Sequence, residues 1–370
     1  MIKIIHKTGI PFMEVKMNIQ EIVKKAVELE ASDIFIVAGS TIAYKVKNRV
    51  TRIEGETLMP EHCKMMVNEL YYLAHNRSME KLEQKGDDDF SFSLTHLARL
   101  RVNVYHQRNS LAAVIRIVQF DIPKADELQI PKEITRFAEL TKGLVIISGP
   151  AGAGKSSTLA VLLDLINKNR SGHIVTIEDP IEYLHRHEQS IVTQREIGSD
   201  CDSSASALKS ALRQAPNVLF ISEMRDLETI SLAITAAETG HLVFSTLHTL
   251  GAANTIDRMV DVFPASQQQQ IRLQLSMVLE AVISQQLIRQ KNGDLVPVFE
   301  VMTNSLAVRN QIRESKTHQL KNTIASSTSE GMISMDTMLM ELLKKDLITL
   351  DEALLHSFDS ELFLKKFNSK

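Results

Sequence analysis

The chain has 370 residues, of which 44% are hydrophobic and 24% are charged, and its formal net charge is -3. These values are typical of a soluble globular protein and give no global reason to expect nucleic-acid binding. No apolar run reaches the roughly 18 residues that a transmembrane helix needs, so membrane insertion is not expected. The two cysteines, Cys63 and Cys201, are too few for a disulfide framework or a four-thiolate zinc site.

The N-terminal region lacks the apolar core and the cleavage site of a signal peptide, so we expect a cytoplasmic protein. Residues 1–118 are predicted to form a smaller α+β domain, with residues 1–16 as an extension. Apolar spacing there predicts two helices, over 19–29 and 61–82, and two hairpins, over 42–53 and 100–118. The short segment 119–123 ends in Pro123 and is a candidate hinge linker between domains.

The second domain, residues 124–370, is predicted to contain a parallel sheet. Continuous apolar strands separated by helical stretches are typical of a parallel sheet that is covered on both faces. Four such runs occur: LVIIS (144–148), IVTI (174–177), VLFIS (218–222) and LVFST (242–246). Ligands bind beyond the carboxyl ends of such strands, so the residues after each run should lie around one site. From about Ile271 onward the chain is predicted to be mostly helical.

The segment GPAGAGKSS follows the first run and matches the phosphate-binding pattern GxxxxGK[ST]. Its glycines let backbone N–H groups approach phosphate oxygens without Cβ clashes. Lys155 can reach the β- and γ-phosphates, the Ser156 hydroxyl can bind Mg²⁺, and a helix over 157–166 would favour the anion. A plain glycine turn is the alternative, but the strand before the segment and the helix after it favour ATP binding. The residues predicted to bind ATP are Gly149, Ala151, Gly152, Ala153, Gly154, Lys155, Ser156 and Ser157.

Polar residues at the ends of the other runs are further candidates. Glu223 follows the run VLFIS and could be a Walker B-like acid that holds the Mg²⁺ shell directly or through water; a solvated strand end is the alternative. His241 and His248 flank the run LVFST and could sense the γ-phosphate, although a structural role fits either histidine equally well. The stretch IEDPIEYLH crowds three carboxylates into residues 178–182, and spacing alone does not say which one does chemistry.

With these motifs in chain order, the sequence resembles the secretion ATPases of the type II/type IV pilus superfamily, and especially the PilT-like pilus retraction ATPases. The resemblance covers roughly residues 17–355. The segments that carry it are GPAGAGKSS (149–157), TIEDPIEYLH (176–185), LFISEMRDLETI (219–230), TAAETGHLVFSTLHT (235–249), DRMVDVFP (257–264), AVRNQIRE (307–314), ASDIFI (31–36) and LRVNVYHQRNSLAAVIRI (100–117).

The resemblance implies a PAS-like N-terminal domain joined to a RecA-like P-loop ATPase domain with a C-terminal helical region, assembled into a homohexamer with ATP between the two domains. It also implies a motor at the inner face of the cytoplasmic membrane that retracts a type IV pilus, supports twitching motility and acts on an inner-membrane platform protein. The roles it assigns are Glu182 as general base, Glu223 as Walker B acid, His241 and His248 as the His-box pair, and Arg101 and Arg116 as arginines that reach the phosphates.

Four positions depart from the family pattern. Ala215 and Asn217 stand where aspartates are usual, Ser222 replaces a glycine and Phe35 replaces a histidine. Every constrained position from Gly149 to Ser156 is nevertheless kept, so we expect an active ATPase whose rate these departures leave open.

Three other functions compete with pilus retraction. A pilus assembly or type II secretion ATPase would usually carry a four-cysteine insert after the His box, and this chain has no cysteine beyond Cys201. A RecA-like nucleic-acid motor would need a basic or aromatic track, and the chain has no tryptophan. A non-catalytic ring component, or a weakly active auxiliary paralogue, stays open because of the departures at 215, 217 and 222.

Overall fold

The computed structural model describes residues 18–46, 49–95, 97–118 and 122–368. Contacts divide the chain into two compact units, Met1–Phe120 and Asp121–Lys370. The predicted extension 1–16 and most of the predicted linker 119–123 lie outside the described residues, so the hinge stays a prediction. No helix in the described part of the chain is both long and apolar enough to cross a membrane.

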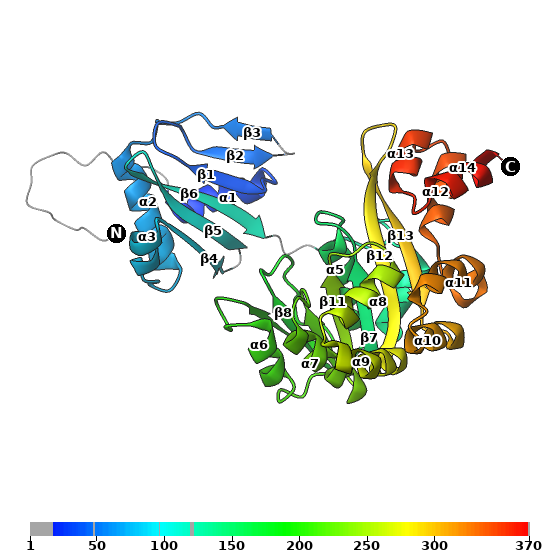
Figure 1. Cartoon of the computed structure of the whole chain (residues 1–370). Coiled ribbons are helices and arrows are strands. Elements are labelled where there is room, and N and C mark those ends of the chain that lie inside the picture. The colour runs from blue at the N-terminus through cyan, green and yellow to red at the C-terminus, as the bar shows by residue number, and fades with distance from the viewer. Residues whose placement is uncertain (1–17, 47–48, 96, 119–121, 369–370) are drawn as a thin grey trace, which may run out of the picture. The chain divides into compact units, whose positions relative to one another are not determined.

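The N-terminal unit is a six-stranded antiparallel sheet with helices packed on one face (Figure 1). Its strand order is β3-β2-β1-β6-β5-β4. Strand residues alternate between buried and accessible, as the period-two pattern predicts, and both predicted hairpins are confirmed. The elements are α1 (Ile19–Glu28), β1 (Asp33–Ile36), β2 (Ala43–Val46), β3 (Arg49–Arg52), α2 (Pro60–Leu73), α3 (Glu80–Lys85), β4 (Asp87–Leu94), β5 (Ala98–Gln107) and β6 (Ser110–Val118).

The single helix predicted over 61–82 is wrong, because the chain leaves the helix between α2 and α3. His75 and Asn76 have φ values of 58° and 56°, in the left-handed region that an α-helix cannot contain. Helix α1 begins as its sequence indicates: the Asn18 side chain accepts a hydrogen bond from the backbone of Glu21, and the two residues form a capping box.

The C-terminal unit is built on a seven-stranded sheet in the order β13-β12-β7-β11-β10-β8-β9. All neighbours are parallel except β12 and β13, which pair as an antiparallel hairpin at one edge. The four predicted strands are confirmed as β7, β8, β10 and β11. The strands are β7 (Gly143–Ser148), β8 (His173–Glu178), β9 (Ile191–Glu196), β10 (Val218–Ile221), β11 (Leu242–Leu247), β12 (Leu279–Arg289) and β13 (Leu295–Thr303).

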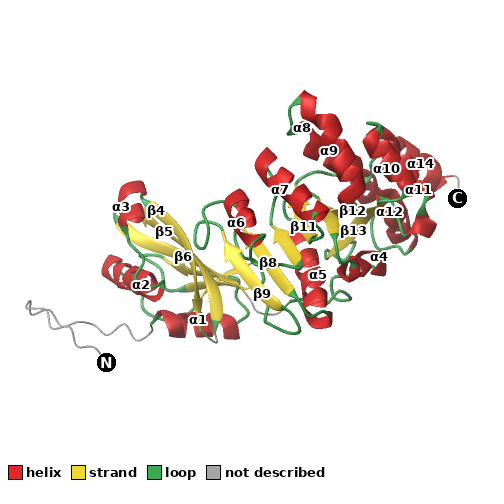
Figure 2. Ribbon diagram, turned by 90° about the horizontal axis from the view of Figure 1, so that it is seen from below, coloured by secondary structure: helices red, strands yellow, loops and turns green. Residues whose placement is uncertain are grey.

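Helices cover both faces of this sheet, which explains why its central strands are apolar along their whole length (Figure 2). Helix α5 packs on one face and α6 to α9 pack on the other. The helices are α4 (Lys132–Thr135), α5 (Lys155–Asn169), α6 (Ser204–Ala211), α7 (Leu227–Glu238), α8 (Ala252–Asp261), α9 (Ala265–Val278), α10 (Leu306–Arg313), α11 (Leu320–Ser326), α12 (Met335–Lys344), α13 (Leu350–His356) and α14 (Ser360–Asn368).

The prediction that the chain is mostly helical after Ile271 is wrong for 279–303, where β12 and β13 form two long strands (Figure 1). Three polar residues, Ser284, Gln285 and Gln286, interrupt the apolar pattern of β12 and hide its strand character. They are nevertheless buried in the fold, because each has a hydrogen-bonding partner on a neighbouring segment.

Two of the departures from the family pattern lie at the amino ends of the strands. The Asn217 side chain accepts a hydrogen bond from the backbone N of His173 at 2.9 Å, which joins the starts of β8 and β10. Ala215 has a φ of 52°, which places a Cβ-bearing residue in the left-handed region.

Replacing Ala215 by glycine should therefore stabilise the protein. Relief of the left-handed penalty of about 1–2 kcal/mol exceeds the entropy that glycine adds to the unfolded chain, so we expect a gain of about 0.5–1 kcal/mol in unfolding free energy. Urea unfolding of the two proteins measures it. The control is Ala325→Gly on the exposed side of α11, which should destabilise. A loss of stability in Ala215→Gly would contradict the strain argument.

Candidate active site

The predicted phosphate-binding loop connects β7 to α5, at the carboxyl end of a central strand. Gly149, Gly152 and Gly154 have φ values of 149°, 78° and 82°, so the loop uses backbone conformations that side chains disfavour. At Gly149 there is also no room: an added Cβ would lie 2.2 Å from the carbonyl oxygen of Gln285. The loop thus needs glycine at this position for both shape and space.

Lys155 begins α5, and its ammonium group is held at the centre of the site. Its Nζ donates to the carbonyl oxygens of Gly149 at 2.8 Å and Pro150 at 2.9 Å. Burial lowers the pKa of Lys155, while the charges of Glu223 and Glu182 act in the opposite direction. The electrostatic environment of this lysine therefore already includes both predicted catalytic carboxylates.

His248 connects the phosphate-binding loop to the Walker B segment. Its Nδ1 lies 3.3 Å from Lys155 Nζ, and its Nε2 lies 3.3 Å from Glu223 Oε2. Lysine can only donate, so Nδ1 is the acceptor in the first contact and Nε2–H can donate in the second. One neutral tautomer of His248 satisfies both contacts, which places the histidine between the two motifs rather than in the core.

Glu223 lies just beyond β10 and is mostly shielded from solvent. Arg225 Nη2 lies 2.7 Å from its Oε2. Partial burial opposes ionisation of Glu223, but the hydrogen bonds from Arg225 and His248 and the charge of Arg225 outweigh it and hold the pKa of Glu223 below its ordinary value. The site therefore contains an ionised carboxylate at the end of a buried strand, as the Walker B prediction requires.

The three acids of IEDPIEYLH occupy different environments. Glu178 ends β8, is 6% exposed, and accepts hydrogen bonds at Oε1 from Thr176 Oγ1 at 2.6 Å and Gln194 Nε2 at 2.9 Å. Asp179 is exposed and precedes a cis peptide bond to Pro180. Glu182 is exposed and lines the cavity described below. Asp179 and Glu182 are both exposed and both line the cavity, whereas Glu178 is buried, so the structure narrows the three acids to two and the family resemblance favours Glu182.

The loop that carries Glu182 is fastened on both sides of this residue. The backbone N of Ile181 donates to Glu196 Oε2 at 3.0 Å, and the carbonyl oxygen of Tyr183 accepts from Gln194 Nε2 at 2.8 Å. The Tyr183 hydroxyl also lies 2.7 Å from Ser157 Oγ in the first turn of α5. These contacts hold Glu182 at a fixed place relative to the phosphate-binding loop.

The residues above surround one cavity of about 510 Å³, a size typical of small-molecule sites. Its walls are the phosphate-binding loop, the Glu178–His185 loop, the Walker B segment and the end of β11. The predicted residues that line it are Ala151, Gly152, Ala153, Gly154, Lys155, Ser156, Ser157, Glu182, Glu223 and His248. Gly149 lies beneath them, as the carbonyl partner of Lys155.

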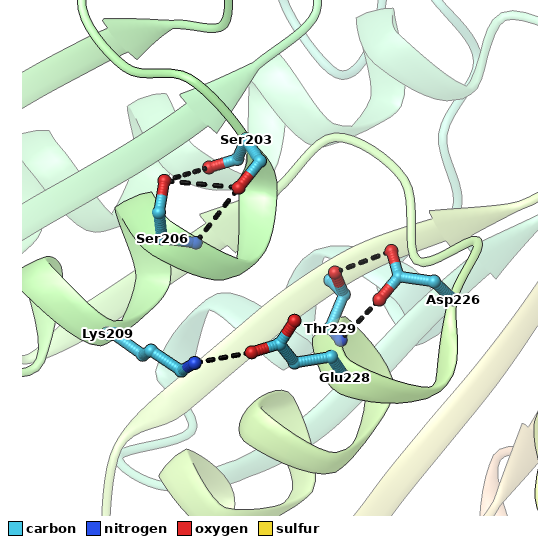
Figure 3. Close-up of polar contacts among 6 residues, drawn as sticks. All are labelled: Ser203, Ser206, Lys209, Asp226, Glu228 and Thr229. Atoms are coloured by element: carbon cyan, nitrogen blue, oxygen red, sulfur yellow. Dashed lines mark hydrogen bonds and ion pairs between the residues drawn. The ribbon is translucent and has the colours of Figure 1, made fainter.

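The helices next to the cavity are anchored by side-chain caps (Figure 3). Asp226 accepts from the backbone N of Thr229 at 2.8 Å and from its hydroxyl at 2.9 Å, and so caps α7. Ser203 caps α6 in the same way, and Lys209 of α6 pairs with Glu228 of α7. Asp226 follows Glu223 closely in sequence, but both of its oxygens are used to begin a helix.

The other predicted residues are His241, which lies at the far end of β11, and two arginines of the N-terminal unit. His241 precedes β11 at its amino end, where its Nδ1 lies 3.0 Å from the carbonyl oxygen of Ala236. Because β11 separates the two histidines, His241 and His248 are about 20 Å apart. Arg101 and Arg116 belong to the N-terminal unit, where they are directly opposite each other on β5 and β6. We therefore carry His248, but not His241, into the proposed catalytic set.

Arg116 and Arg101 belong to a charged row that crosses four strands of the N-terminal sheet. Asp33 is in register with Lys45 on one side and with Arg116 on the other, and Arg116 is in register with Arg101. Arg116 Nε lies 3.0 Å from Asp33 Oδ1, and the Arg116 side chain is 61% exposed. The row contains three cations and one carboxylate, so it has an excess of positive charge suited to an anion.

A Mg²⁺ ion fits the donor set of the cavity. Ser156 and Glu223 line it together and offer a hydroxyl and a carboxylate oxygen, the ligand types that Mg²⁺ prefers. No group of three or more His, Cys, Asp or Glu residues in the described part of the chain could hold a metal ion by itself. Binding would therefore depend on phosphate oxygens and water, as is usual for Mg²⁺ at nucleotides.

Sequence reasoning missed several residues that shape the site. Gln194 and Gln285 fasten the loop of Glu182 and the phosphate-binding loop, but neither belongs to a recognisable motif. Tyr183 lies inside IEDPIEYLH, yet its contact with Ser157 joins two segments that no sequence pattern connects. In the sequence, the one indication of a role for Gln285 is that three polar residues, 284–286, interrupt an otherwise apolar stretch.

The titration of Glu178 should make stability depend on pH. Burial raises the pKa of Glu178 to about 7 from an ordinary value of 4.5, although hydrogen bonds from Thr176 and Gln194 favour its ionised form. Its contribution to stability is therefore complete below the unfolded pKa and is lost as the pH rises through about 7. Relative to Glu178→Gln, the wild type should lose unfolding free energy between about pH 5 and pH 8. Urea unfolding over this range tests it, and a difference that does not change with pH would contradict it.

Comparisons with known proteins identify the family of the chain. The sequence model of the family described as "Type II/IV secretion system protein" matches residues 12–348. The chain is 41% identical over 337 residues to the Type IV pilus retractation ATPase PilT of Pseudomonas aeruginosa, covering 91% of this chain and 97% of that protein. It is 37% identical over 342 residues to the Type IV pilus ATPase PilU of the same organism, covering 92% of this chain and 89% of that protein. A crystal structure of the pilus retraction motor PilT with bound ADP superimposes with a TM-score of 0.85, at 42% identity over 94% of this chain and 98% of that one.

Proposed function

The chain belongs to the Type II/IV secretion system protein family, and from this premise we propose that it is an ATPase motor that retracts type IV pili and so drives twitching motility. The observation that carries the proposal is the single cavity in which Lys155, His248 and Glu223 form a connected line beside Glu182. Phosphoryl transfer to water needs positioned cations, a metal-holding acid and a base, and this cavity offers each of them.

In this proposal each group of residues has a separate role in ATP hydrolysis. Backbone N–H groups of residues 151–157 and the ammonium group of Lys155 bind the phosphates. Ser156 and Glu223 hold Mg²⁺, which neutralises phosphate charge when bound. The carboxylate of Glu182 orients the attacking water and accepts its proton. His248 contacts Lys155 at one ring nitrogen and Glu223 at the other, so it couples changes at the phosphates to Glu223.

Arg116 and Arg101 complete the proposed site from the N-terminal unit. Their row of excess positive charge suits a polyphosphate, and they stabilise charge on the γ-phosphoryl when the domains of a homohexamer close. Closure about residues 119–123 would convert hydrolysis into deformation of the ring. We propose that the ring acts at the inner face of the cytoplasmic membrane, on an inner-membrane platform protein of the pilus.

The phenotype of the organism and the rate of turnover test three alternatives: an assembly ATPase, a weakly active auxiliary paralogue and a non-catalytic ring component. Deleting the gene should abolish twitching motility and leave excess pili on the surface, whereas loss of pili would favour an assembly ATPase. A weakly active auxiliary paralogue is favoured by Ser222, which lines the cavity where the family pattern has glycine. Purified protein with Mg²⁺ and ATP should release phosphate at a steady rate; nucleotide binding without turnover would favour a non-catalytic ring component.

A further inference from the structure

Three consecutive polar residues of β12 contact three different segments of the C-terminal unit. Ser284, Gln285 and Gln286 are 0%, 3% and 6% exposed. Alternation along the strand sends Gln285 to one face of the sheet and its two neighbours to the other. Ser284 Oγ accepts from the backbone N of Gly251, in the loop after His248. Gln286 Oε1 lies 2.8 Å from His356 Nδ1, at the end of α13.

Gln285 lies directly beneath the phosphate-binding loop and touches both of its ends. Its backbone carbonyl fills the space that a Cβ at Gly149 would occupy. Its side-chain Nε2 lies 3.0 Å from the position of a Cβ at Gly154, the residue before Lys155. Its Oε1 accepts a hydrogen bond of 2.8 Å from the hydroxyl of Thr158 in the first turn of α5. One buried side chain thus connects the sheet to the loop and to the helix that would bind phosphate.

We propose that Gln285 is a positioning residue for nucleotide binding, which fixes the phosphate-binding loop and the first turn of α5 in their binding conformation. The inference rests on the proposed function of this cavity and extends it to a residue outside the recognised motifs. Thr158 and Gln285 are both almost fully buried, so removing either partner leaves the other without its hydrogen bond and frees the loop to move. Nucleotide binding must then order the loop, and this ordering lowers the affinity for nucleotide.

The experiment compares matched substitutions on the two sides of β12. Gln285→Met keeps the length of the side chain and removes the hydrogen bond, and Gln286→Met makes the same change one residue along, away from the loop. Thr158→Val removes the partner hydroxyl, and Thr158→Ser keeps it. ADP affinity is measured with a fluorescent ADP analogue, KM and kcat from phosphate release, and folding from the melting temperature without nucleotide.

We expect Gln285→Met and Thr158→Val to weaken ADP binding about tenfold and to raise KM more than they lower kcat. Gln286→Met and Thr158→Ser should bind ADP within about twofold of the wild type. The double variant Thr158→Val/Gln285→Met should lose little beyond either single change, because both remove one interaction.

The inference is overturned if Gln285→Met binds ADP as the wild type does, or if Gln286→Met loses as much affinity. If Gln285→Met does not fold, the Thr158 pair decides: equal affinities of Thr158→Val and Thr158→Ser overturn the inference, and a selective loss in Thr158→Val supports it. A wild type that binds no nucleotide would overturn the proposed function and this inference together, whereas a wild type that binds beside an unaffected Gln285→Met overturns the inference alone.

Discussion

Replacing Glu182 by glutamine should slow ATP hydrolysis by about 10²–10⁴-fold, the usual contribution of a general base, and leave nucleotide binding nearly intact. The side chain is exposed and lines the cavity, and its loop is held by Glu196, Gln194 and Ser157 rather than by the carboxylate itself. Glutamine therefore keeps the fold of the loop but cannot accept a proton from water. Steady-state phosphate release and the affinity for a non-hydrolysable ATP analogue measure the two effects.

The matched control is Glu178→Gln, the same substitution at the last residue of β8, just before the loop that carries Glu182. Glu178 is buried, and its carboxylate accepts hydrogen bonds from Thr176 and Gln194. Burial raises its pKa to about 7, so a neutral side chain is already close to its native state near neutral pH. We expect Glu178→Gln to lower turnover by about tenfold or less, through small shifts of the loop. Greater damage in Glu178→Gln than in Glu182→Gln would make Glu178 the base.

The central strands and the phosphate-binding loop were predictable because each depends on a local pattern. A strand buried on both faces is apolar throughout, and a phosphate-binding loop needs glycines, a lysine and a hydroxyl at fixed spacing. Strand β12 was not predictable in this way, because Ser284, Gln285 and Gln286 are polar and buried. Their burial is stable only through partners that are distant in sequence, and a local pattern carries no information on such partners.

The two histidines illustrate how far sequence reasoning about the site could have gone. His241 and His248 flank one strand, so a rise of about 3.3 Å per residue already separates them by the length of that strand. Strand geometry alone could thus have assigned only one of them to the carboxyl-end site. The bridge that His248 makes between Lys155 and Glu223 could not have been foreseen, because it depends on how two loops meet.

Replacing Arg116 by alanine should lower turnover by about 10³–10⁵-fold, the range of an arginine finger, without abolishing ATP binding. The proposal gives the guanidinium a role in the transition state, so kcat should fall much more than the affinity for the ATP analogue. Arg116→Lys should lie between the wild type and alanine, because lysine keeps the charge next to Asp33 but loses the planar fork. Arg52→Ala is the control, since Arg52 is an exposed arginine on the edge strand β3 of the same unit.

A loss of turnover in Arg116→Ala could also come from unfolding of the N-terminal sheet, and the contacts of Asp33 make this explanation testable. Asp33 is almost buried, and without Arg116 it keeps the hydroxyl of Ser32 at 2.8 Å and Lys45 at 3.9 Å, so the N-terminal sheet should remain folded. Melting temperatures check this. Arg101→Ala removes the cross-strand neighbour of Arg116 and should cause a smaller loss of turnover, because Arg116 keeps its contact with Asp33. Unchanged hydrolysis in a folded Arg116→Ala protein would remove the finger assignment.

Mixed rings of Arg116→Ala and Glu182→Gln subunits test whether the arginine acts on the nucleotide of a neighbouring subunit. If it does, some sites in a mixed ring combine an intact Arg116 from one subunit with an intact Glu182 from the next, and activity returns. If the arginine acts within its own subunit, every site lacks one of the two residues and activity does not return.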